Sequence, residues 1–265
     1  LPTIFVLIFT SDTPTFKIYW NMPTFQCASK RIPFTHIYND FGILQNRDDR
    51  FLGDKMSILY HPGQFPWLTS NGVLEHGGIP QEGDLSAHLE KFRSDLEKSI
   101  PDETFDGLGV IDMERWRPIY NQNYSPSQKY IQTESYNLEK KIHDWKESWL
   151  QYMLQTLATA KEMRPLAQWG YYGFPYCFNM EGSSNQEACS SNTQKLNDEA
   201  YWLWAESDAL YPSLYSKKEL SASELASLIK GRVAESKRVA AKNTPIYPYF
   251  SLTYRNGGFF SEVSF

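Results

Sequence analysis

Hydrophobic and polar residues alternate along the chain with two periods, one typical of strands and one typical of helices. Short apolar runs that end in polar or turn residues predict strands. After Asp84, apolar residues from Leu85 to Ile100 recur at helical spacing, which predicts a capped helix that ends at Pro101. Further strands are predicted at Lys17–Asn21, Gly42–Asn46, Met56–Tyr60, Gly107–Met113, Leu166–Tyr172, Ala209–Tyr215 and Ile246–Thr253, and further helices at Tyr130–Met163, Thr193–Ala205 and Ser221–Lys242.

The regular succession of strands and helices predicts the fold class. Alternating strands and helices imply a parallel sheet with crossover helices on its faces. The seven candidate strands fit a barrel better than an open sheet. We therefore expect an α/β fold, a TIM-like (β/α) barrel, with its functional residues at the carboxyl ends of the strands.

The first ten residues form a nearly continuous apolar run, followed by a polar stretch that contains proline. Such a run is typical of the apolar core of a secretory signal, here without an initiator methionine and a basic start. A buried first strand is the alternative. We expect a signal-peptide remnant at residues 1–10 and a single domain at residues 15–265, in a secreted, extracellular protein.

Composition narrows the class of partner. Lys plus Arg number 26 against 31 Asp plus Glu, and the net charge of −5 argues against nucleic-acid binding through a broad basic surface. The sequence has no apolar run near the ~20 residues that cross a bilayer, which argues against an integral membrane protein. The aromatic share of 15% suits a sugar-binding groove, because flat rings cover sugar faces while hydroxyl and indole groups reach polar partners.

Three cysteines are present. Cys177 and Cys189 flank a short polar loop, and such a pair in an exported protein predicts a disulfide. Cys27 is left over, as a free thiol, as half of an intermolecular bridge, or with a partner absent from this sequence. No paired-cysteine or H-E-x-x-H motif occurs and the histidines are scattered, so the sequence predicts no metal site.

The strongest chemical signal is a pair of acids at the end of the most apolar strand. Asp112 and Glu114 are two residues apart and would point to the same face of that strand. At that distance each disfavours the other's ionisation, so one is expected to stay protonated near neutral pH and to serve as a general acid. The alternative is structural: Asp112 caps the following loop and Glu114 pairs with Arg115 or Arg117.

The spacing of the two acids also limits the mechanism. Two-carboxylate retaining glycosidases use acids on different strands, about 5 Å apart. Neighbouring acids on one strand instead suit substrate-assisted cleavage, in which the acetamido oxygen of an N-acetyl sugar attacks and the first acid orients the amide. The expected substrate is a polymer that contains N-acetylhexosamine.

Four segments carry a family resemblance: Tyr19–Cys27, Gly42–Asn46, Gly107–Pro118 and Trp169–Cys177. They resemble animal hyaluronidases, glycoside hydrolase family 56, and most closely those of insect venom and saliva. The similarity runs in order from Lys17 to Tyr254. It implies a distorted TIM-like barrel that hydrolyses β-1,4 bonds of hyaluronan with retention of configuration, with chondroitin as a second candidate substrate.

The resemblance also assigns roles to single residues. It implies that Glu114 is the proton donor and then the base, and that Asp112 positions the substrate acetamide. The substrate-binding residues that it implies are Tyr172, Tyr215, Tyr60 and Arg117. For each tyrosine taken alone, filling of the barrel interior is the alternative. The resemblance implies no cofactor, and we expect a monomer that binds neither nucleic acid nor membrane.

The chain departs from the family after Gly257. Family members continue with a helix, a strand that ends in a tryptophan, and a cysteine that pairs with the one near the first strand. The sequence therefore predicts a catalytic barrel incomplete at its C-terminus, without its last strand and helix, and a Cys27 without partner. A non-catalytic hyaluronan-binding protein and a chitinase-like hydrolase are the alternative functions. The one N-glycosylation sequon begins at Asn123.

Overall fold

The computed structural model describes residues 16–69, 71–123, 138–181 and 186–259. The chain divides into two compact units, residues 1–51 and 52–265, and each is described by itself. The predicted signal remnant at residues 1–10 lies outside the described residues and stays a prediction, as does the division of the chain into domains.

The first unit is built around one small parallel ladder. Its elements are β1 (Tyr19–Trp20), η1 (Thr24–Lys30), α1 (Ile37–Phe41), β2 (Leu44–Gln45) and η2 (Arg47–Asp49). The two strands pair in parallel. The buried Asp49 carboxylate accepts hydrogen bonds from Thr24 Oγ1 at 2.6 Å and from Gln45 Nε2 at 2.8 Å. Because these donors come from η1 and β2, the carboxylate ties the elements of this unit together.

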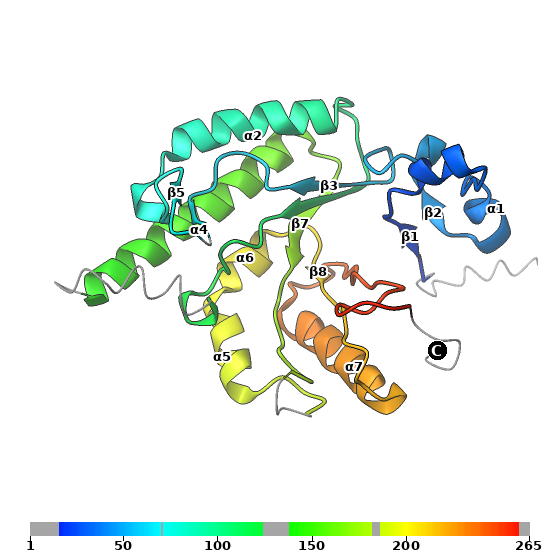
Figure 1. The fold of residues 1–265 in the computed structure, drawn as a ribbon. Helices are drawn as coiled ribbons and strands as arrows, with labels where there is room; N and C mark the ends of the chain where they lie inside the picture. Colours follow the sequence, from blue (N-terminus) through cyan, green and yellow to red (C-terminus); the bar gives the residue numbers. More distant parts are fainter. Residues whose placement is uncertain (1–15, 70, 124–137, 182–185, 260–265) are drawn as a thin grey trace, which may run out of the picture. The chain divides into compact units, whose positions relative to one another are not determined.

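The second unit contains a four-stranded parallel sheet with the order β3, β6, β7, β8 (Figure 1). The strands are β3 (Met56–Tyr60), β6 (Leu108–Asp112), β7 (Gln168–Gly173) and β8 (Tyr211–Pro212). Every residue of β6 is buried, as its apolar run predicts for a strand covered on both faces. The register pairs Tyr60 with Asp112, so the carboxyl ends of β3 and β6 lie level.

Helices follow the strands in the order expected of repeated strand-helix units. They are α2 (Leu85–Ser99), α4 (Leu138–Met163), α5 (Ser191–Glu199), α6 (Tyr201–Glu206) and α7 (Ala222–Val239). The side chain of Asp84 accepts from Ala87 N and caps α2, as predicted. Figure 1 shows α2 lying along α4. Within the described residues, no helix is long and apolar enough to span a membrane.

Two shorter features join β3 to α2. A hairpin of β4 (Trp67–Leu68) and β5 (Leu74–Glu75) pairs in the antiparallel sense, and η3 (Pro80–Glu82) follows it. The sequence patterns do not indicate this hairpin, because each of its strands has two residues, too few to show an alternation. A further short helix, η4 (Tyr120–Gln122), lies after β6.

The predicted strand at Ile246–Thr253 is wrong as a regular element. Two parallel bridges join Leu210 to Ile246 and Ser213 to Tyr249, so this segment does run beside β8. Tyr247 N donates to Leu210 O and Tyr249 N to Pro212 O, but Pro212 of β8 has no N–H to donate to Tyr247 O, which interrupts the ladder. The predicted helix at Thr193–Ala205 is likewise divided, into α5 and α6, at Ala200.

Much of the aromatic excess lies in the hydrophobic core. Trp145 and Trp149 of α4 are fully buried, and Phe65 and Trp116 pack against them. Trp169 of β7 is also fully buried. A high aromatic content is therefore explained in part by packing, and the rings that serve a sugar must be identified from their position at the carboxyl edge of the sheet.

Candidate active site

The two acids lie at the carboxyl end of β6 and differ sharply in environment. Asp112 is the last residue of the strand and is 5% exposed, whereas Glu114 is exposed and lines a pocket of about 320 Å³. Among the described residues, no ion pair joins Glu114 to Arg115 or Arg117, and no group hydrogen-bonds to Asp112 Oδ1. The structural alternatives of a capped loop and a surface ion pair therefore find no support in this part of the chain.

The environment of Asp112 changes its ionisation. Burial, and then the negative charge of Glu114, raise the pKa of Asp112 to about 7. Below that pH the Asp112 carboxyl is mostly protonated in the free protein. The sequence predicts that one of the two acids stays protonated, and the structure identifies it as the buried one.

Three predicted tyrosines surround the acid pair. The ring centroids of Tyr172 and Tyr215 are 6.3 Å apart, and each side chain is among the groups that shift the pKa of the other. Tyr60 is 59% exposed at the end of β3. The pKa of each tyrosine is raised, by burial first and then by neighbouring groups that include Glu114. All three therefore remain protonated donors at neutral pH.

Arg117 lies on the same side as Tyr172. Its guanidinium carbon is 4.5 Å from the ring centroid of Tyr176 and 4.8 Å from that of Phe178, and Nη1 donates to Gln122 O at 2.6 Å. These contacts hold the side chain in the pocket wall with Glu114. Its role toward substrate stays a prediction.

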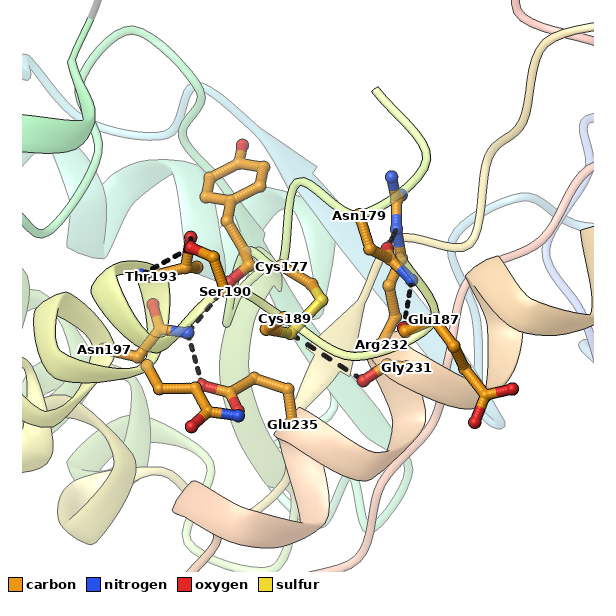
Figure 2. The surroundings of a disulfide bond; sticks show 12 residues. Cys177, Asn179, Glu187, Cys189, Ser190, Thr193, Asn197, Gly231, Arg232 and Glu235 are labelled. Carbon is orange, nitrogen blue, oxygen red and sulfur yellow. Dashed lines mark hydrogen bonds between the residues drawn. A yellow bond between two sulfur atoms is a disulfide. The ribbon is translucent and has the colours of Figure 1, made fainter. Parts of the chain in front are cut away.

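The far wall of the pocket is fixed by the disulfide loop. Cys177 and Cys189 form the disulfide that the sequence predicts. Figure 2 shows Asn179 of this loop beside Arg232 of α7: Asn179 Nδ2 donates to Glu187 O at 2.9 Å, and Arg232 Nε donates to Asn179 Oδ1 at 3.2 Å. Arg232 also donates to Ser213 O at 2.8 Å and to Glu181 at 3.0 Å. The loop, α7 and the end of β8 therefore form one hydrogen-bonded wall.

Close packing between this loop and α7 depends on a glycine. A Cβ at Gly231 would lie 1.8 Å from Glu187 O, a distance that no side chain permits. Cys189 Sγ also contacts Gly231 O, at 3.9 Å. The helix therefore approaches the disulfide loop more closely than any other residue type at this position allows.

The geometry of Asn123 bears on the predicted glycosylation. Asn123 is 8% exposed, and its Nδ2 donates to the carbonyls of Arg117, Ile119 and Tyr120. Nδ2 is the atom to which a glycan would attach, so a glycan requires these bonds to be given up. The rest of the sequon lies outside the described residues, and the modification stays a prediction. In the folded chain this side chain organises the turn that carries Arg117.

Several residues at the site have no clear signal in the sequence. Tyr249 packs edge-on against Tyr172 with centroids 5.2 Å apart, and the charge of Asp112 is among the causes that raise its pKa, after burial. The parallel bridge from Ser213 to Tyr249 brings it there, and only the tertiary pairing shows this.

In the first unit, which is described by itself, Cys27 is a free thiol of intermediate exposure. Within the described residues, no group of three or more His, Cys, Asp or Glu side chains is placed to hold a metal ion.

The chain is similar in sequence to known hyaluronidases. A family model described as Hyaluronidase matches residues 8–263. A hyaluronidase of Apis mellifera is 37% identical over 262 residues, which cover 91% of this chain and 69% of that protein. Hyaluronidase Tab y 2.0101 of Tabanus yao is 40% identical over 244 residues, covering 85% of this chain and 69% of that protein.

The solved structures agree with the sequence comparisons. The crystal structure of bee venom hyaluronidase in complex with a hyaluronic acid tetramer matches with a TM-score of 0.88 and 36% identity, and the match covers 94% of this chain and 84% of that one. A second, monoclinic crystal form of bee venom hyaluronidase matches with a TM-score of 0.87. The chain has the fold of that protein, and the α/β, TIM-like fold class predicted from the sequence is confirmed.

Proposed function

We propose, from the premise that this chain belongs to the hyaluronidases of glycoside hydrolase family 56, that it cleaves hyaluronan internally at β-1,4 bonds by a retaining, substrate-assisted mechanism. One observation carries the proposal: the exposed Glu114 lines a pocket beside the buried Asp112, whose Oδ1 meets no partner among the described residues. A buried acceptor without a partner is costly. An acetamide N–H of the substrate would supply the missing donor.

The first step breaks the glycosidic bond. Protonated Glu114 transfers its proton to the leaving oxygen while the acetamido carbonyl oxygen attacks the anomeric carbon from the opposite face. The products are a cyclic oxazolinium ion on the enzyme and a released sugar with a free hydroxyl. Asp112 accepts the acetamide N–H, which orients the carbonyl for attack and stabilises the positive charge of the ring.

The second step restores the enzyme. Glu114, now ionised, removes a proton from water, and the resulting hydroxide adds to the anomeric carbon on the face that the leaving group vacated. The acetamide reforms, and the configuration is retained after two inversions. The proton lost from Glu114 in the first step is thus returned to it from water.

The first step needs a proton on Glu114, and substrate binding can move the proton there from Asp112. Before substrate binds, the proton of the pair resides on Asp112, because burial raises the pKa of its carboxyl to about 7. A substrate N–H that donates to Asp112 favours its ionised form and leaves the proton to Glu114, where the first step needs it. The hydroxyls of Tyr172 and Tyr215 remain protonated and can donate to the acetamide oxygen.

The pocket suits an acidic polysaccharide. Arg117, Arg232 and Arg255 line it together with Glu114 and Glu181, giving it a cationic excess of one charge. Aromatic rings of Tyr172, Tyr176, Phe178 and Tyr215 supply flat apolar surface for sugar faces. Hyaluronan is the expected substrate, with chondroitin as the second. The disulfide supports secretion, because such bonds persist in oxidising compartments.

The product distribution tests this function. Purified protein is incubated with hyaluronan, chondroitin and chitin oligosaccharides, and the new reducing ends are followed by proton NMR from the first turnover. We expect hyaluronan fragments with N-acetylglucosamine at the reducing end, formed first as the β-anomer. The α-anomer would contradict the mechanism, binding of hyaluronan without turnover would indicate a binding protein, and preferential cleavage of chitin would indicate a chitinase-like hydrolase.

A further inference from the structure

Arg115, the residue after the exposed acid, is stacked face-on against Trp67 of the β4 hairpin. Its guanidinium carbon lies 3.8 Å from the centroid of the Trp67 ring. The next residue, Trp116, is buried and donates its Nε1–H to Pro66 O at 2.9 Å. The dipeptides 66–67 and 115–116 are therefore joined twice, by a hydrogen bond and by a cation–π contact, and the cation is held in one orientation.

Within the described part of the chain, the side-chain nitrogens of Arg115 meet no hydrogen-bond acceptor and form no ion pair with a carboxylate. Stacking engages only the face of the group and leaves its five N–H donors available in the plane. Arg232 differs in this respect, because its nitrogens donate to Asn179, Ser213 and Glu181. Stacking on Trp67 therefore holds the Arg115 guanidinium in place, while its N–H donors stay available to a ligand.

The position of Arg115 relative to the acids follows from the sheet order. Trp67 comes after β3, and β3 and β7 flank β6 on opposite sides. His61, which directly follows β3, donates its backbone N–H to Asp112 O at 2.9 Å, and after burial the Arg115 charge is the second cause that lowers the pKa of its imidazole. Arg115 therefore lies on the β3 side of the acid pair. The pocket with Tyr172 lies on the β7 side.

We propose that Arg115, held against Trp67, binds the carboxylate of a uronic acid on the β3 side of Glu114 and so selects an acidic polysaccharide over a neutral one. The inference rests on the proposed function. A planar guanidinium binds a carboxylate through two parallel N–H···O bonds, a geometry that a free edge permits. In a polymer that alternates N-acetylhexosamine with uronic acid, one of the sugars at the cleaved bond carries a carboxylate. A polymer of N-acetylglucosamine alone offers none.

The test pairs a change in the protein with a change in the substrate. Arg115→Gln and Arg115→Lys are compared with the parent on hyaluronan oligosaccharides whose uronate carboxyls are either free or methyl-esterified. We expect Arg115→Gln to lower kcat/KM on the free acid about 10- to 100-fold, mainly through KM, and to leave kcat/KM on the ester within about twofold. Lysine keeps the charge but loses the paired geometry and should restore only part of the loss.

Two controls keep the outcome decisive. Arg93→Gln removes an exposed arginine of α2 that pairs with Glu162 of α4 at 2.9 Å. This variant should leave kcat/KM unchanged on both the free acid and the ester. The same oligosaccharides are titrated against the Glu114→Gln protein with and without Arg115→Gln, which measures Kd without turnover. If Arg115→Gln lowers kcat/KM equally on the free acid and on the ester, or lowers it on neither, the proposed role of Arg115 is wrong. Absence of cleavage by the parent with the Kd difference intact contradicts the proposed function and leaves Arg115 as a carboxylate-binding residue.

Discussion

Tyr60 and Asp112 are register partners at the carboxyl ends of neighbouring parallel strands. The tyrosine is 59% exposed and the aspartate 5%, and the Asp112 charge is the second cause, after burial, that raises the pKa of the Tyr60 hydroxyl. The buried acid therefore has both the protonated Tyr60 hydroxyl and the Glu114 carboxyl close enough to interact with it electrostatically. This placement leads to predictions about stability as well as catalysis.

Asp112→Asn should stabilise the protein at alkaline pH. The folded-state pKa of Asp112, about 7, lies above its ordinary value of 3.8, so folding favours the protonated form. That contribution is complete below about pH 4 and is lost as the pH rises through 7. Asparagine cannot ionise, so we expect the variant to exceed the parent by about 2–4 kcal/mol at pH 8.5 and to equal it near pH 4. Urea unfolding at both pH values measures the difference, and a gap that does not change with pH would contradict the assignment.

The hydroxyls of Tyr172 and Tyr215 should act as a unit. Tyr172→Phe and Tyr215→Phe each remove one of two neighbouring hydroxyls, on rings whose centroids are 6.3 Å apart and whose pKa values affect each other. We expect each to lower kcat on hyaluronan about 10- to 100-fold, with a double variant far less impaired than the product of the two effects. Tyr201→Phe, at a position 71% exposed on α6, is the control and should leave kcat unchanged. Fully multiplicative losses would indicate that the two hydroxyls act separately.

The disulfide should support both stability and the pocket. Replacing Cys177 and Cys189 by serine opens a loop of sequence separation 12, for which chain entropy predicts a loss of about 3 kcal/mol. Because Cys177 lines the pocket beside Tyr176, KM for hyaluronan should rise as well. Thermal unfolding and steady-state kinetics measure the two effects. Cys27→Ser removes the free thiol and is the matched control; an equal effect from that variant would show that the bridge itself is unimportant.

A buried histidine should make the fold sensitive to acid. His88 Nδ1 accepts from Gln64 N at 2.9 Å, so the neutral ring carries its proton on Nε2 and donates it to Thr156 Oγ1 at 2.8 Å. Burial, and then the nearby His76, lower its pKa from 6.5 to about 4. Folding therefore favours neutral His88, and its contribution is complete above about pH 6.5 and is lost as the pH falls toward 4.

A substitution at this histidine isolates the effect. His88→Asn keeps an acceptor for Gln64 but loses the contact with Thr156, so the variant should be about 2 kcal/mol less stable at pH 7. Its stability should then fall less than that of the parent between pH 6.5 and pH 4. His143→Asn, whose side chain is 73% exposed, should keep the parent profile. Parallel pH profiles for the parent and His88→Asn would contradict the role assigned to His88.

The sequence predicts those features whose cause is local. The run that forms β6 and the Asp84 cap of α2 are visible because apolar periodicity and capping act over a few residues. The pairing of Ser213 with Tyr249 and the stack of Arg115 on Trp67 are not, because each joins segments distant in the chain. The regular strand predicted at Ile246–Thr253 fails because Pro212 of the neighbouring strand lacks the N–H that would continue the ladder, and the apolar pattern of residues 246–253 does not show which residues pair with it.

The two acids illustrate the same limit. Their spacing predicts that one carboxyl is held protonated, but burial decides which one, and burial is a property of the folded chain. Tyr172 and Tyr211 are register partners on β7 and β8, yet only Tyr172 lines the pocket, whereas Tyr211 is fully buried and donates to Gln168 O.

The most direct measurement of the central claim is single-turnover cleavage of hyaluronan by Glu114→Gln, together with the Kd of that variant for hyaluronan oligosaccharides. Glutamine keeps the shape of the side chain but can neither donate the acidic proton nor accept one from water. We predict a rate reduced at least about 10³-fold with Kd within about threefold of the parent. A variant that keeps more than about a tenth of the parent rate would contradict the assignment of Glu114 as the acid and base.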